Sequence, residues 1–176
     1  PYQAVTSTDL YLTHYLNDSA NDPVMNRIRA QKLRNSEEDK VKIFFVPSYL
    51  NGDDGVLNMP YYDLLVGMDL TAFPSYYEPW GYTPLESLAF KVPTITTTLA
   101  GFGLWVKEHY NMNHPGIEVI HREDGDASNV ATAIAEWVKN YTQVGETEMQ
   151  KDRDNAKDVS RIALWDNLIN YYKQAY

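Results

Sequence analysis

Two carboxylates in a short aromatic segment are the residues of this chain best suited to chemistry. Glu78 and Glu86 stand eight positions apart in the segment Tyr-Glu-Pro-Trp-Gly-Tyr-Thr-Pro-Leu-Glu, residues 77–86. A carboxylate can accept hydrogen bonds from sugar hydroxyls and can stabilise positive charge that develops in a transition state. Glu78 has no obvious local cap to make, so it is the stronger candidate. The alternative for Glu78 is a solvated loop charge.

Glu86 has a competing structural explanation. Residues 83–86, Thr-Pro-Leu-Glu, have the pattern of a capping box, with Thr83 at the N-cap and Pro84 at the first helical position. In that arrangement the Glu86 carboxylate bonds back to the Thr83 amide. Because a carboxylate has two oxygens, capping and ligand binding are both open to Glu86.

The residues between the two glutamates suit an anionic ligand that carries rings. Gly81, Tyr82 and Thr83 would present backbone amides at a helix N-terminus, where the helix dipole favours negative charge. Trp80 could stack on a sugar or a base, or could equally well pack against the sheet edge. The apolar run 70–74 before this loop predicts a buried strand. In open α/β sheets, a strand followed by a loop and a helix N-terminus is where phosphorylated ligands bind.

Strands and helices alternate along the rest of the chain. Hydrophobic periodicity and turn residues predict these elements: strands at 41–46, 70–74, 93–97 and 117–121, and helices at 22–33, 60–68, 84–90, 103–111, 128–143 and 146–175, with a break in the last expected near Trp165. This order predicts a doubly wound, mainly parallel, Rossmann-like α/β sheet with a C-terminal helical segment at 146–176. We expect one domain over 1–176, incomplete at its N-terminus, since no strand with a Gly-rich turn precedes residue 41. The Gly-Phe-Gly at 101–103 should line the same crevice as the aromatic loop.

The aromatic segment resembles the signature of animal and fungal glycogen synthases, glycosyltransferase family 3. Four further segments resemble the same family: 13–18, 41–47, 60–65 and 96–103. The last reads Thr-Thr-Thr-Leu-Ala-Gly-Phe-Gly and departs from the family's pattern at Thr98 and Ala100. The similarity is strong over roughly 12–120 and loose in the C-terminal helices.

The resemblance implies the C-terminal, donor-binding half of a two-domain GT-B enzyme. Such an enzyme is a retaining glucosyltransferase that moves glucose from UDP-glucose to a growing α-1,4-glucan, with no metal and no cofactor. Carried over by position, Glu78 is the catalytic residue beside the donor glucose, and Glu86 binds the donor ribose. The stretch that meets the diphosphate is Gly81, Tyr82 and Thr83, with Trp80 beside it, and Tyr61 packs on the uracil ring.

Charge and composition limit the partners of this chain. The net charge of −9 leaves no basic patch for nucleic acid or an anionic membrane. No apolar run is long enough for a transmembrane helix, no signal peptide is visible, and no cysteine occurs, which together favour a cytoplasmic protein. The four histidines lack metal-ligand spacing.

The distribution of cations suggests that the donor site is incomplete. A diphosphate needs nearby Lys or Arg, yet residues 43–90 contain neither, and Lys91 and Lys107 are the nearest along the chain. We therefore expect the missing cations and the glucan-binding N-terminal domain to lie outside this chain, and the chain alone to be inactive. A homo-oligomer of the full-length enzyme stays open. Only Arg153 and Arg161 occur in the last helical region, so no response to glucose 6-phosphate is expected.

Two other functions fit parts of the sequence. The chain could be a nucleotide-sugar-binding module without catalysis. It could also belong to a GT-B glycosyltransferase with another donor or acceptor, such as ADP-glucose, because the spacing of Glu78 and Glu86 is shared across such families. The full aromatic run favours the glycogen synthase branch.

Overall fold

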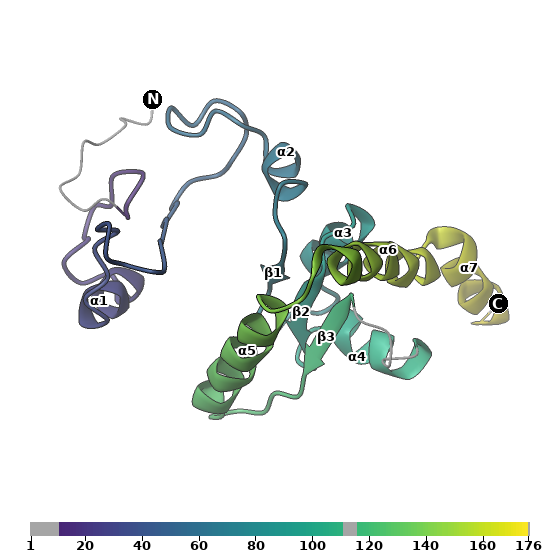
Figure 1. The fold of residues 1–176 in the computed structure, drawn as a ribbon. Coiled ribbons are helices and arrows are strands. Elements are labelled where there is room, and N and C mark those ends of the chain that lie inside the picture. Colours follow the sequence, from purple (N-terminus) through teal and green to yellow (C-terminus); the bar gives the residue numbers. More distant parts are fainter. Residues whose placement is uncertain (1–10, 111–115, 176) are drawn as a thin grey trace. The chain divides into compact units, whose positions relative to one another are not determined.

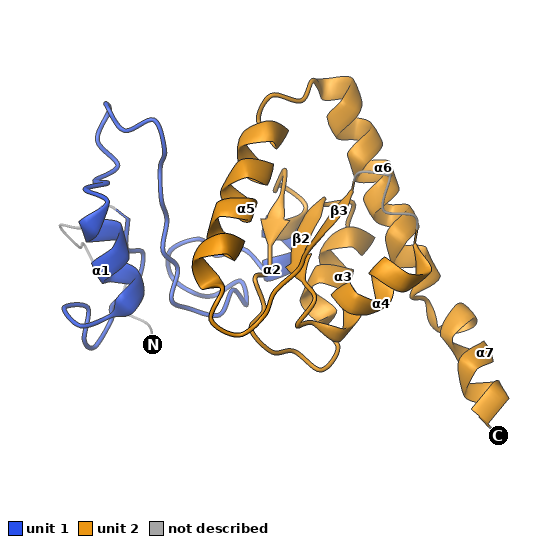
Figure 2. Cartoon of the chain, turned by 90° about the horizontal axis from the view of Figure 1, so that it is seen from below, with its two compact units in different colours: residues 1–64 blue, residues 65–176 orange. Residues whose placement is uncertain are grey.

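A computed structural model describes residues 11–110 and 116–175, which form two compact units, 1–64 and 65–176 (Figure 2). The first unit contains one helix of eight residues, α1 (Pro23–Ala30). Asp22 caps this helix, because its Oδ1 accepts hydrogen bonds from the amides of Val24 and Met25, both at 2.9 Å. Met25 and Ile28 on α1 are buried against Tyr11. The expectation of a single domain stays a prediction.

The predicted strand at 41–46 is wrong. This apolar run makes only one isolated bridge, between Phe45 and Leu12. Beside Ile43, the Asn35 side chain occupies the position of a neighbouring strand: it donates to the Ile43 carbonyl at 2.7 Å and accepts from the Ile43 amide at 2.9 Å. A second backbone lies alongside this run at Phe45 alone, whose amide donates to the Tyr11 carbonyl at 2.6 Å and whose carbonyl accepts from the Thr13 amide at 3.1 Å. Because the pairing does not continue to Ile43, where a side chain satisfies the backbone instead, no strand forms.

The polar loop after this run is partly buried. Asp54 is only 1% exposed, although a carboxylate in a polar, turn-rich segment is usually solvated. Its carboxylate accepts hydrogen bonds from the amides of residues 56, 57 and 58, and His14 Nε2 lies 3.0 Å from its carbonyl oxygen. Asp54 therefore organises the loop from inside, because its side chain satisfies backbone donors that folding removes from water.

The second unit is built on three parallel strands in the order β1-β2-β3. These are β1 (Thr71–Ala72), β2 (Thr94–Thr97) and β3 (Ile117–Ile120), with Thr71 beside Thr94 and Ile95 beside Glu118. The helices are α2 (Tyr61–Leu65), which begins in the first unit, α3 (Tyr82–Ala89), α4 (Gly101–His109), α5 (Ala127–Tyr141), α6 (Glu146–Ile162) and α7 (Trp165–Ala175) (Figure 1). The predicted class, a parallel α/β fold, is confirmed, and so is the predicted break near Trp165.

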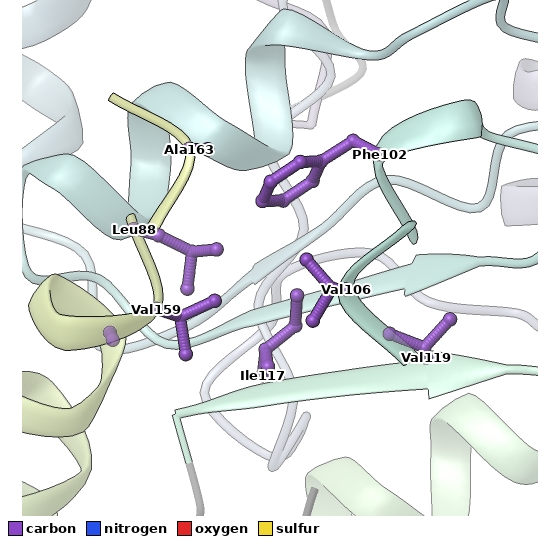
Figure 3. Packing of buried hydrophobic residues seen from close by; sticks show 8 residues of the cluster. Leu88, Phe102, Val106, Ile117, Val119, Val159 and Ala163 are labelled. Carbon is purple, nitrogen blue, oxygen red and sulfur yellow. The ribbon is translucent and has the colours of Figure 1, made fainter. Parts of the chain in front are cut away.

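Helices cover both faces of this small sheet. On one face α3, α4 and α6 pack against β3 through a core of Leu88, Phe102, Val106, Ile117, Val119, Ala156, Val159 and Ala163 (Figure 3). On the other face lies α5 (Figure 2). Its Val130 packs with Ile95 and Ile120, with Ile134 and Trp137 beside them. Hydrogen bonds between hydroxyl groups join α3 to the sheet. Thr71 Oγ1 on β1 lies 2.7 Å from Ser87 Oγ on α3 and 3.0 Å from Thr94 Oγ1 on β2. These contacts fix where the loop between β1 and α3 must run.

Asp152 on α6 carries an unusual buried carboxylate. The residue is 4% exposed, and Oδ1 has no hydrogen-bond partner within the described ranges. Burial, and then the charge of Glu148, raise the pKa of this carboxyl above its ordinary value. The folded protein therefore binds the proton more tightly than the unfolded chain. The carboxylate's penalty is absent below the unfolded pKa, grows as the pH rises from the unfolded to the folded pKa, and is constant above the folded pKa.

We expect Asp152→Asn to raise the free energy of unfolding at pH 7 by about 1 kcal/mol, because a neutral amide costs less to bury than an unpaired charge. The gain should shrink as the pH falls below the folded pKa of Asp152. Urea unfolding at neutral and acid pH measures both effects, with Glu136→Gln on the exposed face of α5 as the matched control. A variant no more stable than the parent at pH 7 would show that the carboxylate has a partner.

Candidate functional site

The segment from Ser75 to Gly81, called here the signature loop, lies against the turn after β2. The Glu78 amide donates to the Leu99 carbonyl at 3.1 Å, and the Glu78 carbonyl accepts from the Gly101 amide at 3.1 Å. The Phe102 amide donates to the Trp80 carbonyl at 2.6 Å. The expected neighbourhood of these two segments is therefore confirmed. Glu78 sits on a backbone that is hydrogen-bonded on both sides of its Cα atom.

Glycines allow two close approaches of backbone on backbone. A Cβ atom on Gly101 would collide with the Pro79 carbonyl oxygen of the signature loop, and one on Gly103 would collide with the Thr97 carbonyl oxygen at the end of β2. A side chain on Gly101 would push the signature loop away from the turn after β2, and one on Gly103 would push α4 away from β2. The Gly-Phe-Gly motif thus serves packing of backbone on backbone, a role that only the folded structure reveals.

Helix α3 begins two residues earlier than predicted. Its N-cap is Gly81 at φ 98°, a left-handed conformation that favours glycine, and Tyr82 is the first helical residue. The predicted capping box is therefore wrong: Thr83 lies inside the helix. Glu86 is in the second turn, and its carboxylate makes no capping bond in the described part of the chain. Pro84 still falls in the first turn, where a missing N–H costs no helical bond.

The N-terminus of α3 is open. Within residues 11–110 and 116–175, the amides of Tyr82 and Thr83 have no acceptor, as expected for the first turn of a helix without a side-chain cap. Glu78 is exposed and lies beside this end, since a Cβ atom on Gly81 would be 3.3 Å from its Cγ. Glu86 follows Tyr82 by four residues and so shares its face of α3. The fold thus brings a free carboxylate and two free amides together.

Trp80 is engaged in packing. Its ring centroid lies 5.7 Å from that of Phe102 and 5.8 Å from that of Trp105. Trp80 also borders a pocket of about 670 Å³ lined by Tyr82, Leu85, Trp105, His109, Ala163, Trp165, Leu168 and Tyr171. The packing interpretation of Trp80 therefore has direct support, and a contact of its ring with a ligand stays a prediction.

Arg122 is a residue of the site that sequence reasoning missed. It follows β3 by two positions, and its Nη1 donates to the carbonyls of Pro74 at 2.7 Å and Ser75 at 3.3 Å. The signal was available, because the carboxyl ends of parallel strands meet at one edge, where ligands bind. Lys91, one of the cations considered instead, follows the far end of α3 and pairs with Asp154 at 2.8 Å.

The remaining candidates lie elsewhere or carry no new role. Tyr61 is on α2 in the first unit, with its ring 5.4 Å from that of Tyr62, and its contact with a base stays a prediction. In the part of the chain that the structure describes, no group of three potential ligands could hold a metal. His114 is outside that part. The described helices include none with the length and apolarity needed to cross a membrane.

Comparisons with known proteins decide the family. A sequence profile described as glycogen synthase matches residues 5–176. The chain belongs to the glycogen synthase family. It is 32% identical over 166 residues to glycogen (starch) synthase isoform 1 of Saccharomyces cerevisiae, covering 92% of this chain. It is 32% identical over 164 residues to the liver glycogen (starch) synthase of Mus musculus, covering 93%, and 35% identical over 157 residues to that of Caenorhabditis elegans, covering 88%. The resemblance drawn from the signature loop is thereby confirmed.

This glycogen synthase family member spans about a quarter of the length of the curated relatives it matches, 23% in each of these three.

Both arginines of its α6 helix have partners within the chain. Arg153 bonds Asp69 at 3.0 Å and the Met68 carbonyl at 3.0 Å, and Arg161 bonds Asp158 at 3.1 Å. The absence of a response to glucose 6-phosphate stays a prediction.

Proposed function

We propose that this chain forms the donor-binding part of a retaining glucosyltransferase that moves glucose from UDP-glucose to a growing α-1,4-glucan. One observation carries the proposal: the exposed Glu78 carboxylate stands beside the open N-terminus of α3, on a backbone bonded to the turn after β2. Relatives at 32–35% identity carry the name glycogen synthase. The GT-B architecture and a cytoplasmic location belong to the same proposal.

The geometry suits the charges of this reaction. The bond between glucose C1 and the diphosphate oxygen breaks, a bond between C1 and the 4-oxygen of the acceptor forms, and the acceptor proton passes to the departing diphosphate. Negative charge then grows on the departing diphosphate, where the amides of Tyr82 and Thr83 and the α3 dipole would stabilise it. Positive charge grows on the sugar ring, where the Glu78 carboxylate would stabilise it.

The other candidates have supporting roles in this proposal. Glu86 would bind the ribose, Tyr61 the uracil, and Trp80 would form a wall of the site while packing on α4. No metal or cofactor is invoked. The acceptor glucan and further cations for the diphosphate would come from sequence outside this chain, so the chain alone should not turn over.

Calorimetric titration of the full-length protein with UDP-glucose tests the site. In this proposal the Glu78 carboxylate also accepts hydrogen bonds from the sugar hydroxyls, and the Thr83 hydroxyl donates to the diphosphate. Removing a hydrogen bond to a charged group costs about 1.5–3 kcal/mol, so Glu78→Ala and Thr83→Val should each weaken binding about tenfold or more. Glu136→Gln on α5 is the control and should bind as the parent does. Unchanged affinity in both site variants would contradict the assignment.

The same titration separates the alternative functions. Tighter binding of ADP-glucose than UDP-glucose would assign a different donor. Binding of UDP-glucose without transfer to a glucan by the full-length protein would assign a binding module.

A further inference from the structure

We propose that Arg122 is a positioning residue: its guanidinium holds the beginning of the signature loop and, through that loop, the carboxylate of Glu78. The inference rests on the proposed function only for the role of Glu78 as the catalytic carboxylate. The positioning of the loop rests on contacts within the second unit.

The guanidinium contacts three consecutive residues ahead of Glu78. Nη1 donates to the Pro74 carbonyl at 2.7 Å and to the Ser75 carbonyl at 3.3 Å. The guanidinium carbon lies 4.8 Å from the ring centroid of Tyr76, within the range of a cation–π interaction. One side chain therefore restrains the chain where it leaves β1 and turns into the loop.

Arg122 is itself attached to the turn that pairs with the signature loop. Its amide donates to Thr98 Oγ1 at 3.0 Å, and the Thr98 amide donates to the Ile120 carbonyl at 3.0 Å. The adjacent Thr97 hydroxyl donates to the Ser75 carbonyl at 2.7 Å. The ends of β2 and β3 thus form a fixed base from which Arg122 reaches the loop.

The chemistry of this contact requires arginine. A guanidinium has several donors in one plane and a flat face, so it can bond carbonyls and lie over a ring at the same time. A lysine ammonium is a compact point charge without that plane. Among the described residues Arg122 forms no ion pair, and its buried Nε has no hydrogen-bond acceptor. A buried donor without an acceptor is unfavourable, so the contacts with the loop are the evident gain from this side chain.

Hydrogen exchange of this chain tests the positioning without any assay of activity. In Arg122→Gln the amides of Glu78 and Gly101, which join the two segments, should exchange about tenfold faster. Amides in β2 and β3 and the Tm should stay as in the parent. Arg122→Lys should not restore the parent's protection. Tyr76→Phe should keep that protection, and Tyr76→Leu should lose part of it.

Two results of the exchange experiment would overturn the inference. One is unchanged exchange at Glu78 in Arg122→Gln. The other is faster exchange spread evenly over the second unit, which would make Arg122 a residue of general stability. In the full-length enzyme, Arg122→Gln should lower kcat more than it raises KM for UDP-glucose, and an equal change in both would also count against positioning. If the parent enzyme transfers no glucose, the proposed function fails while the exchange result still stands.

Discussion

Glu78→Gln should lower the rate of glucosyl transfer by the full-length enzyme about 10²–10⁴-fold. The variant keeps the size and the polar atoms of the side chain and removes only its charge, which the proposed mechanism places beside the developing positive charge of the sugar ring. Transfer of labelled glucose from UDP-glucose to glycogen measures the effect. The loss should fall on kcat, with KM changed little, because the glutamine side chain keeps atoms that hydrogen-bond the sugar hydroxyls, whereas the lost charge acts on the positive charge of the transition state.

The structure supplies clean controls for this variant. Glu78 is exposed, and its side chain has no hydrogen-bond partner among the described residues, so Glu78→Gln should leave the stability within about 0.5 kcal/mol of the parent. Glu86→Gln should act mainly on KM, because the ribose is remote from the reacting bond. Glu136→Gln on α5 should change nothing. Turnover of Glu78→Gln close to that of the parent would exclude Glu78 as the catalytic carboxylate.

Gly101→Ala and Gly103→Ala should destabilise the second unit by about 1–3 kcal/mol each, or by more if the backbone cannot move. A methyl group on either residue meets a carbonyl oxygen, of Pro79 for Gly101 and of Thr97 for Gly103. Backbone atoms cannot yield as a flexible side chain would. Urea unfolding of this chain measures the loss of stability.

The two substitutions should differ at the site. Gly101→Ala pushes directly on the signature loop, so it should also weaken UDP-glucose binding by the full-length protein, whereas Gly103→Ala should act more through β2 and α4. Gly145→Ala is the control for the steric clash, because a methyl group there has no neighbour within 4 Å and the backbone φ is −78°. Gly145 is the N-cap of α6, where alanine is less favourable than glycine, so this control should lose no more than about 1 kcal/mol. Full stability in Gly101→Ala would show that the loop and the turn after β2 are not held together as the structure has them.

Local signals in the sequence predicted most of the elements well. Asp22 caps α1, and the helical region after residue 146 breaks before Trp165. Apolar residues recur at helical spacing in α5 and α6, and Val130 and Val159 among them are buried. These features depend on interactions between residues within one or two helical turns of each other, so they can be predicted from the sequence alone.

The predictions of a strand at 41–46 and of a capping box at 83–86 were wrong, because each depended on a contact or a backbone conformation that the local pattern does not reveal. The run 41–46 has the composition of a strand, but Asn35 satisfies the backbone of Ile43 where a second strand would lie. The capping box at 83–86 had every residue that the pattern requires. The helix nevertheless begins at Tyr82, after Gly81 at the N-cap in a left-handed conformation that no pattern of side chains predicts.

The sequence by itself determined the family, the two carboxylates and the glycines around them, because residue types and spacing carry that information directly. Only the tertiary structure decided that the signature loop pairs with the turn after β2 and that Arg122 reaches Pro74 and Ser75. Arg122 stands 47 or more positions from those carbonyls. Parallel strands join at one edge segments that lie far apart in the chain, and such contacts follow from the packing of the whole sheet.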